Sequence, residues 1–135
     1  MEKIAIVTGA SRGLGRGIAL TLAKEGGFKV YSTARNGKAL DELSNDASEN
    51  ETGGSVVPYV LDQNDDSAVE QFVSIVIANE GKIDVLVNSA YGGLVAIAPH
   101  FGKPFWKRPT SVYDEAMNIG VRSSYVMSKF VAPVM

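Results

Sequence analysis

Short apolar runs alternate along the chain with longer segments in which apolar residues recur at helical spacing. The apolar runs cover residues 3–8, 28–33, 55–62 and 82–89. A strand that is buried on both faces of a parallel sheet reads as an unbroken apolar run of this length. The pattern therefore predicts four buried strands separated by helices.

Three segments between these runs have the spacing of amphipathic helices: residues 14–24, 37–50 and 65–81. In the last of them, Asp65 or Asp66 is placed to cap the first turn, since a short acidic side chain can accept from the free backbone N–H groups there. Its buried stripe is expected to comprise Val69, Phe72, Val73 and Val76.

The pattern changes beyond the fourth run. Residues 90–110 have low periodicity and are expected to form a loop, and helical spacing resumes over 111–135. Strands that alternate with helices predict an α/β fold, here a Rossmann-type doubly wound parallel sheet of about four strands in one domain, residues 1–135. Pro58 cannot donate to a strand ladder, which places the third strand at an edge of that sheet.

Composition excludes several classes of protein. The net charge is −2, so bulk charge favours neither nucleic acid nor an anionic membrane, and no stretch reaches the roughly 20 apolar residues of a membrane span. The N-terminus has no secretory leader pattern. There is no cysteine, which removes disulfides and thiolate metal sites. We expect an intracellular, cytoplasmic protein without a bound metal.

The most informative motif is "TGASRGLG" at residues 8–15, between the first predicted strand and the first predicted helix. A helix N-terminus offers unpaired N–H groups and the positive end of the helix dipole to a phosphate. Gly9 allows a sharp exit from the strand, Gly13 leaves room for a phosphate and Gly15 lets the helix pack closely on the sheet. The motif predicts a dinucleotide site; the alternative is a tight turn without a ligand.

Two arginines refine the expected ligand. Where dinucleotide-binding folds of this topology carry an acidic residue for the adenosine ribose, this sequence reads "STARN", with Arg35 in place of a carboxylate and Ser32 and Thr33 nearby. A guanidinium suits a 2′-phosphate, and Arg12 in the glycine turn could reach the same group. These residues favour NADP(H) over NAD(H), the alternative being two solvated surface arginines.

Taken together, "TGASRGLG", Asp62 after the third strand, "VNSAYGG" after the fourth and "MNIG" later in the chain resemble the short-chain dehydrogenase/reductase family. The resemblance extends over the whole chain and corresponds to the N-terminal half of such an enzyme. The stretch from Asn88 to Tyr125 resembles one branch of the family in particular.

The resemblance implies roles for individual residues. Asp62 would contact the adenine amino group, Asn88 and Ala90 would line the adenosine and hold the fourth strand, and Asn118 would be the catalytic asparagine whose backbone carbonyl holds a water of the proton relay. The glycine turn would contribute the residues at the pyrophosphate and ribose: Gly9, Ser11, Arg12, Gly13 and Leu14. Ser89 and Tyr91 replace the usual Asn and Gly of the family motif, and Ser89 could loosen a supporting hydrogen bond.

Family chemistry also requires a Ser, and a Tyr followed four residues later by a Lys. Tyr125 and Lys129 have that spacing, but Tyr125 follows Asn118 by only seven residues and no fifth strand intervenes. We therefore interpret Tyr125 as a packing or interface residue, on the same helical side as Val131 and Val134. The chain is expected to be the cofactor-binding half of an NADP(H)-dependent reductase or dehydrogenase of small carbonyls or alcohols, inactive alone.

Two other interpretations remain. The chain could be a naturally short form without catalysis that binds nucleotide or protein, using the 111–135 helix, which in family members packs against a partner subunit; a homo-oligomer is possible. It could also be an unrelated receiver or flavodoxin-like module, although no acidic cluster suits a phospho-acceptor.

Three aromatic residues of the 90–110 loop could either line a substrate pocket or pack onto the core: Phe101, Phe105 and Trp106. The only histidine, His100, is expected on the surface.

Overall fold

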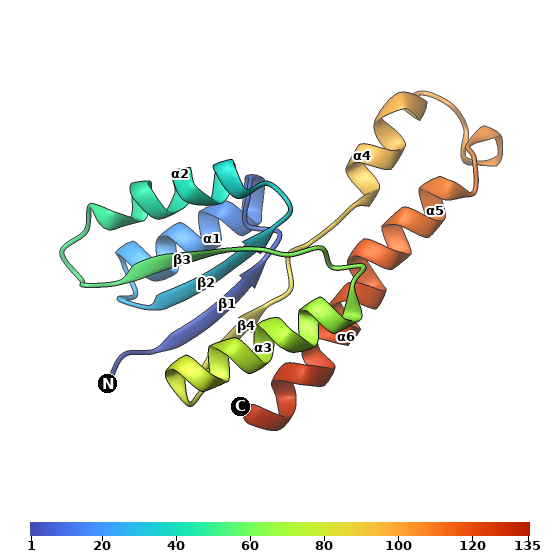
Figure 1. The fold of residues 1–135 in the computed structure, drawn as a ribbon. Coiled ribbons are helices and arrows are strands. Elements are labelled where there is room, and N and C mark those ends of the chain that lie inside the picture. Colours follow the sequence, from blue (N-terminus) through green and yellow to red (C-terminus); the bar gives the residue numbers. More distant parts are fainter.

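A four-stranded parallel sheet organises the molecule, which a computed structural model describes over residues 1–135. The strands are β1 (Ile4–Thr8), β2 (Lys29–Ala34), β3 (Ser55–Val60) and β4 (Val85–Val87), in the spatial order β3-β2-β1-β4 (Figure 1). All three pairings are parallel, as expected when helices connect successive strands. The predicted α/β fold with a Rossmann-type sheet is confirmed.

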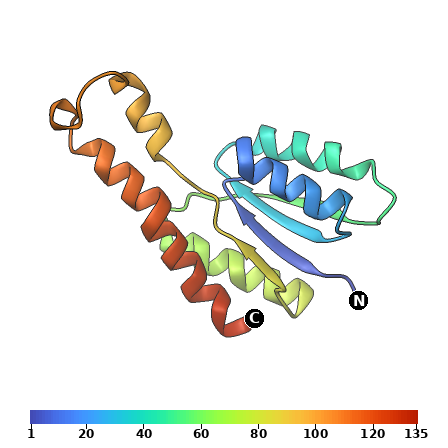
Figure 2. The same cartoon turned by 180° about the vertical axis from the view of Figure 1, so that it is seen from behind.

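Helices cover both faces of the sheet (Figures 1 and 2). On one face lie α1 (Gly13–Lys24) and α2 (Gly37–Ser48), whose alanines and leucines form a core with Val7, Val30 and Val56. On the other face lie α3 (Asp66–Glu80) and α6 (Ser123–Val131), packed on Ile4, Ile6 and Tyr31. The two cores cover both faces of the central strands β1 and β2, which are buried almost throughout, whereas the outer strands β3 and β4 are only partly buried.

The predicted stripe of α3 is confirmed. Its four members are buried: Val69, Phe72, Val73 and Val76. Asp65 caps the helix by accepting from the Ala68 N–H at 3.0 Å, and Gly81 ends it in the left-handed conformation at φ 73°.

Strand β3 lies at an edge, as Pro58 predicts. The backbone N–H groups of Ser55 and Leu61 donate to the carbonyls of Phe28, just before β2, and Ala34, at the end of β2, at 3.0 and 2.9 Å. Since N–H directions alternate along a strand, the nitrogen of Pro58 faces away from β2, on the outer side. Its missing donor therefore costs the sheet no hydrogen bond.

The 90–110 segment contains more structure than its sequence pattern predicts. A short helix, α4 (Gly93–Ile97), is followed by the 3₁₀ turns η1 (Ala98–His100) and η2 (Phe105–Lys107). The prediction of a loop was wrong over α4 because its apolar residues are consecutive and show no amphipathic spacing. None of the helices combines the length and the apolar character needed to cross a membrane.

The predicted 111–135 helix is broken. It consists of α5 (Ser111–Ala116), the π-helical segment η3 (Met117–Arg122), α6 and a last turn, η4 (Ala132–Val134). Within η3, Ile119 and Gly120 leave helical geometry, with φ/ψ of −103°/75° and 173°/−79°. The Ile119 carbonyl released by this kink accepts from the Gly92 N–H at 2.8 Å.

After the kink, the side of the helix that packs on the core differs from the predicted one. Tyr125 and Val134 are 70% and 39% exposed, and of the three residues assigned to that side only Val131 is buried. Val126 and Met127 join Val131 in the core against α3. Tyr125 and Val131 are six positions apart, about 240° around a helix, so they cannot share one side of α6, and the exposed Tyr125 remains open to an interface role.

Candidate functional site

The turn between β1 and α1 is shaped by two glycines in the left-handed region. Gly9 has φ 65° and Gly13 has φ 58°, values that side chains disfavour. The first turn of α1 carries no acidic residue, and Arg12 at its N-cap makes no side-chain capping bond. The N–H groups at this end of α1 therefore have no side-chain acceptor and can serve an anion.

The three glycines of the turn have different surroundings. A Cβ on Gly9 would lie 2.6 Å from the Ala90 Cα, and a Cβ on Gly15 would run into the Gly9 carbonyl. Around Gly13, by contrast, no atom lies within 4 Å of the position of a Cβ. Gly9 and Gly15 thus serve close packing, while Gly13 leaves open space beside the helix N-terminus.

Thr8, the last residue of β1, joins this turn to the end of β4. Its Oγ1 accepts from the backbone N–H groups of Ser89 and Ala90, both at 3.1 Å, and the residue is 1% exposed. The backbone that follows β4 is therefore held although Ser89 replaces the family's usual asparagine. This role of Thr8 cannot be read from the sequence, since it depends on β1 and β4 lying side by side.

Arg12 directly precedes α1 and Arg35 directly follows β2, so both lie where the parallel strands have their carboxyl ends. The Ala10 N–H donates to the Thr33 carbonyl at 3.0 Å and so holds the glycine turn against the end of β2. Both arginines are exposed, and neither takes part in an ion pair. The hydroxyls of Ser32 and Thr33 are buried without a hydrogen-bond partner. Although these two residues are near Arg35 in sequence, their hydroxyls offer nothing to a ligand at the surface beside it.

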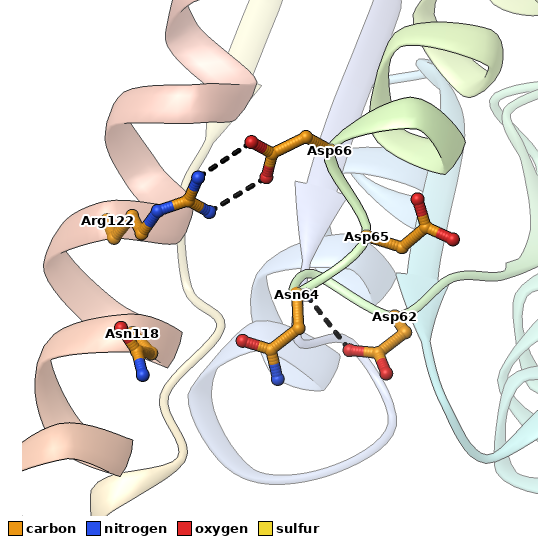
Figure 3. Close-up of a pocket in the computed structure, with 6 residues that line it drawn as sticks. All are labelled: Asp62, Asn64, Asp65, Asp66, Asn118 and Arg122. Carbon is orange, nitrogen blue, oxygen red and sulfur yellow. Dashed lines mark hydrogen bonds and ion pairs between the residues drawn. The ribbon is translucent and has the colours of Figure 1, made fainter.

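A polar hollow of about 600 Å³ lies between the β3–α3 connection and η3 (Figure 3). No hydrophobic residue lines it; its walls are formed by Asp62, Asn64, Asp65, Asp66, Asn118 and Arg122. The Asp62 Oδ1 accepts from the Asn64 N–H at 2.9 Å, which fixes the carboxylate at the turn after β3. The structure thus brings Asp62 and Asn118, 56 positions apart in the chain, to the walls of one hollow.

An ion pair spans one side of this hollow (Figure 3). Arg122 Nη1 and Nη2 donate to Asp66 Oδ1 and Oδ2 at 2.8 and 2.7 Å. The guanidinium hydrogen bonds hold the pKa of Asp66 below its ordinary value, and the carboxylate raises the pKa of Arg122. This pair links the first turn of α3 to η3, and nothing in the sequence pattern indicates it.

Asn118 and Asn88 occupy different parts of the site. Asn118 lies in η3 immediately before the kink, and its carbonyl accepts from the Ser123 N–H. Asn88, just after β4, donates from Nδ2 to the Ser128 Oγ at 3.1 Å and so ties the end of β4 to α6. The ring of Tyr91 lies against Gly120, where a Cβ would be 3.2 Å from its Cδ2. A side chain at the kink would therefore displace this ring slightly.

The remaining candidates lie outside this site. Phe101, Phe105 and Trp106 are 68%, 77% and 72% exposed, so the interpretation that they pack onto the core was wrong. His100 lies in η1, is partly buried and has an unpartnered Nδ1. No three His, Cys, Asp or Glu side chains are grouped in a way that would hold a metal ion.

Comparison with known proteins relates this geometry to one family. A sequence model of the short chain dehydrogenases matches residues 3–135. Dehydrogenase/reductase SDR family member 1 of Mus musculus is 43% identical over 98% of this chain, and that of Homo sapiens is 42% identical. In both cases the match covers 42% of the relative, so the chain spans less than half the length of these curated relatives.

Solved structures have the same arrangement of elements. A metagenomic short-chain oxidoreductase in complex with NADP is 31% identical, with a TM-score of 0.84 over 98% of this chain and 56% of that one. The alcohol dehydrogenase from the archaeon Thermococcus sibiricus, complexed with 5-hydroxy-NADP, is 25% identical, with a TM-score of 0.82 over 99% of this chain and 53% of that one.

Proposed function

Because this chain belongs to the short-chain dehydrogenase family, we propose that it carries the NADP(H)-binding part of an oxidoreductase that acts on a small carbonyl or alcohol. Members of the family act on small molecules, and the family resemblance of the sequence motifs is confirmed. The observation that carries the proposal is the uncapped N-terminus of α1 behind Gly9 and Gly13, with two unpaired arginines beside it. NADP(H), when bound, supplies or accepts the hydride of such a reaction.

The pyrophosphate would lie at the glycine turn. The open space at Gly13 admits a phosphate to the backbone, and the N–H groups of the first turn of α1 would donate to its oxygens. Ser11 and Leu14, on either side of Gly13, would complete the contacts to the pyrophosphate and ribose. Gly9 and Gly15 would act indirectly, because they let the turn and the helix pack closely enough to form the cradle.

A 2′-phosphate would be held by Arg12 and Arg35. Neither guanidinium is neutralised by a carboxylate, and the last residues of β2 offer no acidic side chain to a ribose hydroxyl. An unpaired guanidinium gains most from a phosphate, which it can bind through two parallel hydrogen bonds. This is the reason for preferring NADP(H) to NAD(H), and two of the structural relatives are complexes with NADP or a derivative.

The adenosine would extend from the end of β2 toward Asp62. The carboxylate of Asp62 can accept from the adenine amino group, while Asn88 and Ala90 would border the adenosine from the end of β4. Asn118, on the far wall of the polar hollow, would act in proton transfer in the longer enzyme. Residues 1–135 would then serve as one cofactor-binding domain.

The 135 residues are expected to bind the cofactor without turnover. Tyr125 is 70% exposed on α6 and makes no hydrogen bond, and the Lys129 ammonium lies 5.4 Å from the centre of the Phe130 ring. Neither side chain is arranged as a proton donor with its partner. Exposed Tyr125 and Val121 are instead suited to a contact with a second subunit, which light scattering would detect as a doubled mass.

Calorimetric titration with NADPH and NADH tests the proposal. We expect the chain to bind NADPH more tightly than NADH, and Arg35→Asp to weaken NADPH binding on the order of tenfold or more while leaving NADH binding unchanged or stronger. Arg108→Asp, which removes an arginine far from the glycine turn in sequence, is the matched control and should bind both as the wild type does. Equal affinity for the two cofactors would contradict the preference, and binding of neither would contradict the proposal. Steady NADPH oxidation with small carbonyls, abolished by Tyr125→Phe, would overturn the assignment of no turnover.

A further inference from the structure

Residues 98–110, which we call the aromatic tip, form the outer end of an arm that projects from the sheet. Figures 1 and 2 show α4 and this segment extending away from the strands and returning through α5. Within the arm α4 packs on α5, and both helices contact η3, which leads on to α6. The aromatic tip is thus the part of the molecule that a large flat partner can reach first.

The aromatic tip exposes side chains that normally avoid water. Phe101, Phe105 and Trp106 are 68%, 77% and 72% exposed, and the last two rings meet edge to face with centroids 5.4 Å apart. Apolar side chains on the flanking helices are exposed as well: Leu94, Val95 and Tyr113. Apolar side chains gathered on one projecting segment in this way are typical of a surface that binds a partner.

The tip is ordered by its own backbone rather than by packing of these rings. The N–H groups of Lys103, Lys107 and Arg108 each donate to the carbonyl three residues earlier, at 3.0 to 3.1 Å, and the Arg108 Nε donates to the Lys103 carbonyl at 3.0 Å. Two 3₁₀ turns result, and they present the aromatic residues from a defined scaffold. The exposure of the rings is therefore a property of a folded segment.

Charge is segregated in the same region. Residues 85–113 contain three basic residues, all of them in the tip, and no acidic residue. The other 106 residues hold ten basic and 15 acidic side chains, a net charge of −5. The tip therefore carries three cations and no carboxylate on a protein that is otherwise acidic, and the two acidic residues of the arm, Asp114 and Glu115, lie behind it in α5. The field of the tip itself is directed at an anionic surface even though the net charge of the whole chain is not.

From these observations we propose that the aromatic tip docks the protein on an anionic lipid membrane, as a peripheral contact. Tryptophan and phenylalanine rings insert at the level of the headgroups, and lysine and arginine at their sides bind the negative leaflet. A nucleic-acid groove would instead need more cations than the tip offers and fewer apolar side chains. The proposal uses none of the residues assigned to the cofactor, so its failure would not affect the proposed function.

The single tryptophan of the chain lies in the tip and reports directly on the contact. The 135-residue protein would be mixed with vesicles of phosphatidylcholine alone or with about a third phosphatidylserine. We expect sedimentation with the anionic vesicles only, together with a blue shift of Trp106 emission and loss of quenching by iodide. No binding to either kind of vesicle, or equal binding to both, would overturn the proposal.

Two pairs of variants separate the tip from the rest of the surface. Lys103→Glu with Lys107→Glu should lower the vesicle partition coefficient on the order of tenfold or more. The control, Lys38→Glu with Lys129→Glu, has the same net charge but changes exposed lysines elsewhere, and it should lower the partition coefficient far less. Phe101→Ala with Phe105→Ala should abolish the blue shift, and Tyr125→Ala, 70% exposed on α6, should retain it. Equal losses in both members of a pair would contradict the proposal. A blue shift that occurs without vesicles and grows with protein concentration would also contradict the proposal, because a second copy of the chain would then cover the tip. Binding of an oligonucleotide in the absence of vesicles would contradict it as well.

Discussion

Arg122 and Asp66 lie 56 positions apart and join η3 to the first turn of α3 through two parallel hydrogen bonds of 2.8 and 2.7 Å. The pair stands at the side of the polar hollow whose walls include Asp62 and Asn118. Because both side chains are about half exposed, the pair contributes little to the stability of the fold. Its main effect is to hold the two walls of the hollow in a fixed position relative to each other.

The pair predicts a change in titration. Arg122→Gln removes the charged donor that lowers the Asp66 pKa, so the titration of the Asp66 carboxyl should move up toward its ordinary value. Carboxyl-carbon NMR of the two proteins measures this directly. Asp84, whose pKa is lowered mainly by the Ile4 N–H and then by Lys82, is the internal control and should not move. An unchanged Asp66 titration would show that the pair does not form in solution.

The two left-handed glycines predict different consequences for the same substitution. Gly13→Ala puts a methyl into open space and should cost about 1–2 kcal/mol in the free energy of unfolding, from the positive φ alone, while it weakens NADPH binding. Gly9→Ala adds a collision with the Ala90 backbone and should cost more than about 2 kcal/mol. Urea unfolding followed by circular dichroism compares the two. Equal destabilisation would mean that the turn moves away from Ala90 at little cost.

Removal of the Thr8 hydroxyl should lower the free energy of unfolding through the loss of hydrogen bonds alone. Thr8→Val keeps the shape of the side chain but leaves the Ser89 and Ala90 N–H groups without their acceptor, which should cost about 1–3 kcal/mol. Amide hydrogen exchange at Ser89 and Ala90 should accelerate in the same variant. Thr8→Ser retains the oxygen and serves as the control, with those two amides still protected. Wild-type protection in the valine variant would refute the role assigned to the hydroxyl.

Glu80 predicts a stability that depends on pH. Its Oε1 accepts from Lys29 at 2.7 Å and from the Tyr31 hydroxyl at 2.6 Å, and chiefly the bond from Lys29 lowers the Glu80 pKa. A carboxyl whose pKa is lower in the folded state stabilises the fold above its unfolded pKa, and the contribution is lost as the pH falls through the folded value. Glu80→Gln should therefore be about 1–3 kcal/mol less stable than wild type at pH 7.

That difference should shrink below about pH 4.3, where the unfolded carboxyl protonates, and disappear at lower pH still. Urea unfolding of both proteins across this range is the measurement. Glu70→Gln, an exposed position on the same helix, should show no comparable loss at neutral pH. A pH-independent gap between wild type and Glu80→Gln would indicate that the loss comes from packing and not from charge.

Local features of this fold could be read from the sequence because the residues that cause them are neighbours in the chain. A strand buried on both faces consists mainly of apolar residues, so the run at residues 3–8 predicts β1 almost to its ends. The stripe from Val69 to Val76 and the cap at Asp65 are likewise properties of one helix. The glycine turn follows the same rule, since Gly9 and Gly13 supply the conformations that it needs.

Features that depend on distant partners could not be read in this way. The kink in η3 is accompanied by the Gly92 N–H and the Tyr91 ring, which come from the segment after β4. The apolar spacing over residues 111–135 carries no sign of them, and so one continuous helix was predicted there. The two hydrogen bonds to Thr8 and the Arg122–Asp66 ion pair each join residues more than 50 positions apart. Only the topology brings these groups together.

The outward-facing nitrogen of Pro58 makes the two edges of the sheet unequal in their ability to pair with another strand. At the β3 side an added strand would find no donor at Pro58 and could not complete its ladder. At the β4 side, Asp84 donates inward to the Ile4 carbonyl at 2.8 Å, so the N–H groups of Val85 and Val87 point outward and are free to pair. Any further strand, from a longer polypeptide or from another molecule, would therefore join next to β4, and β1 would then occupy the interior of a wider sheet.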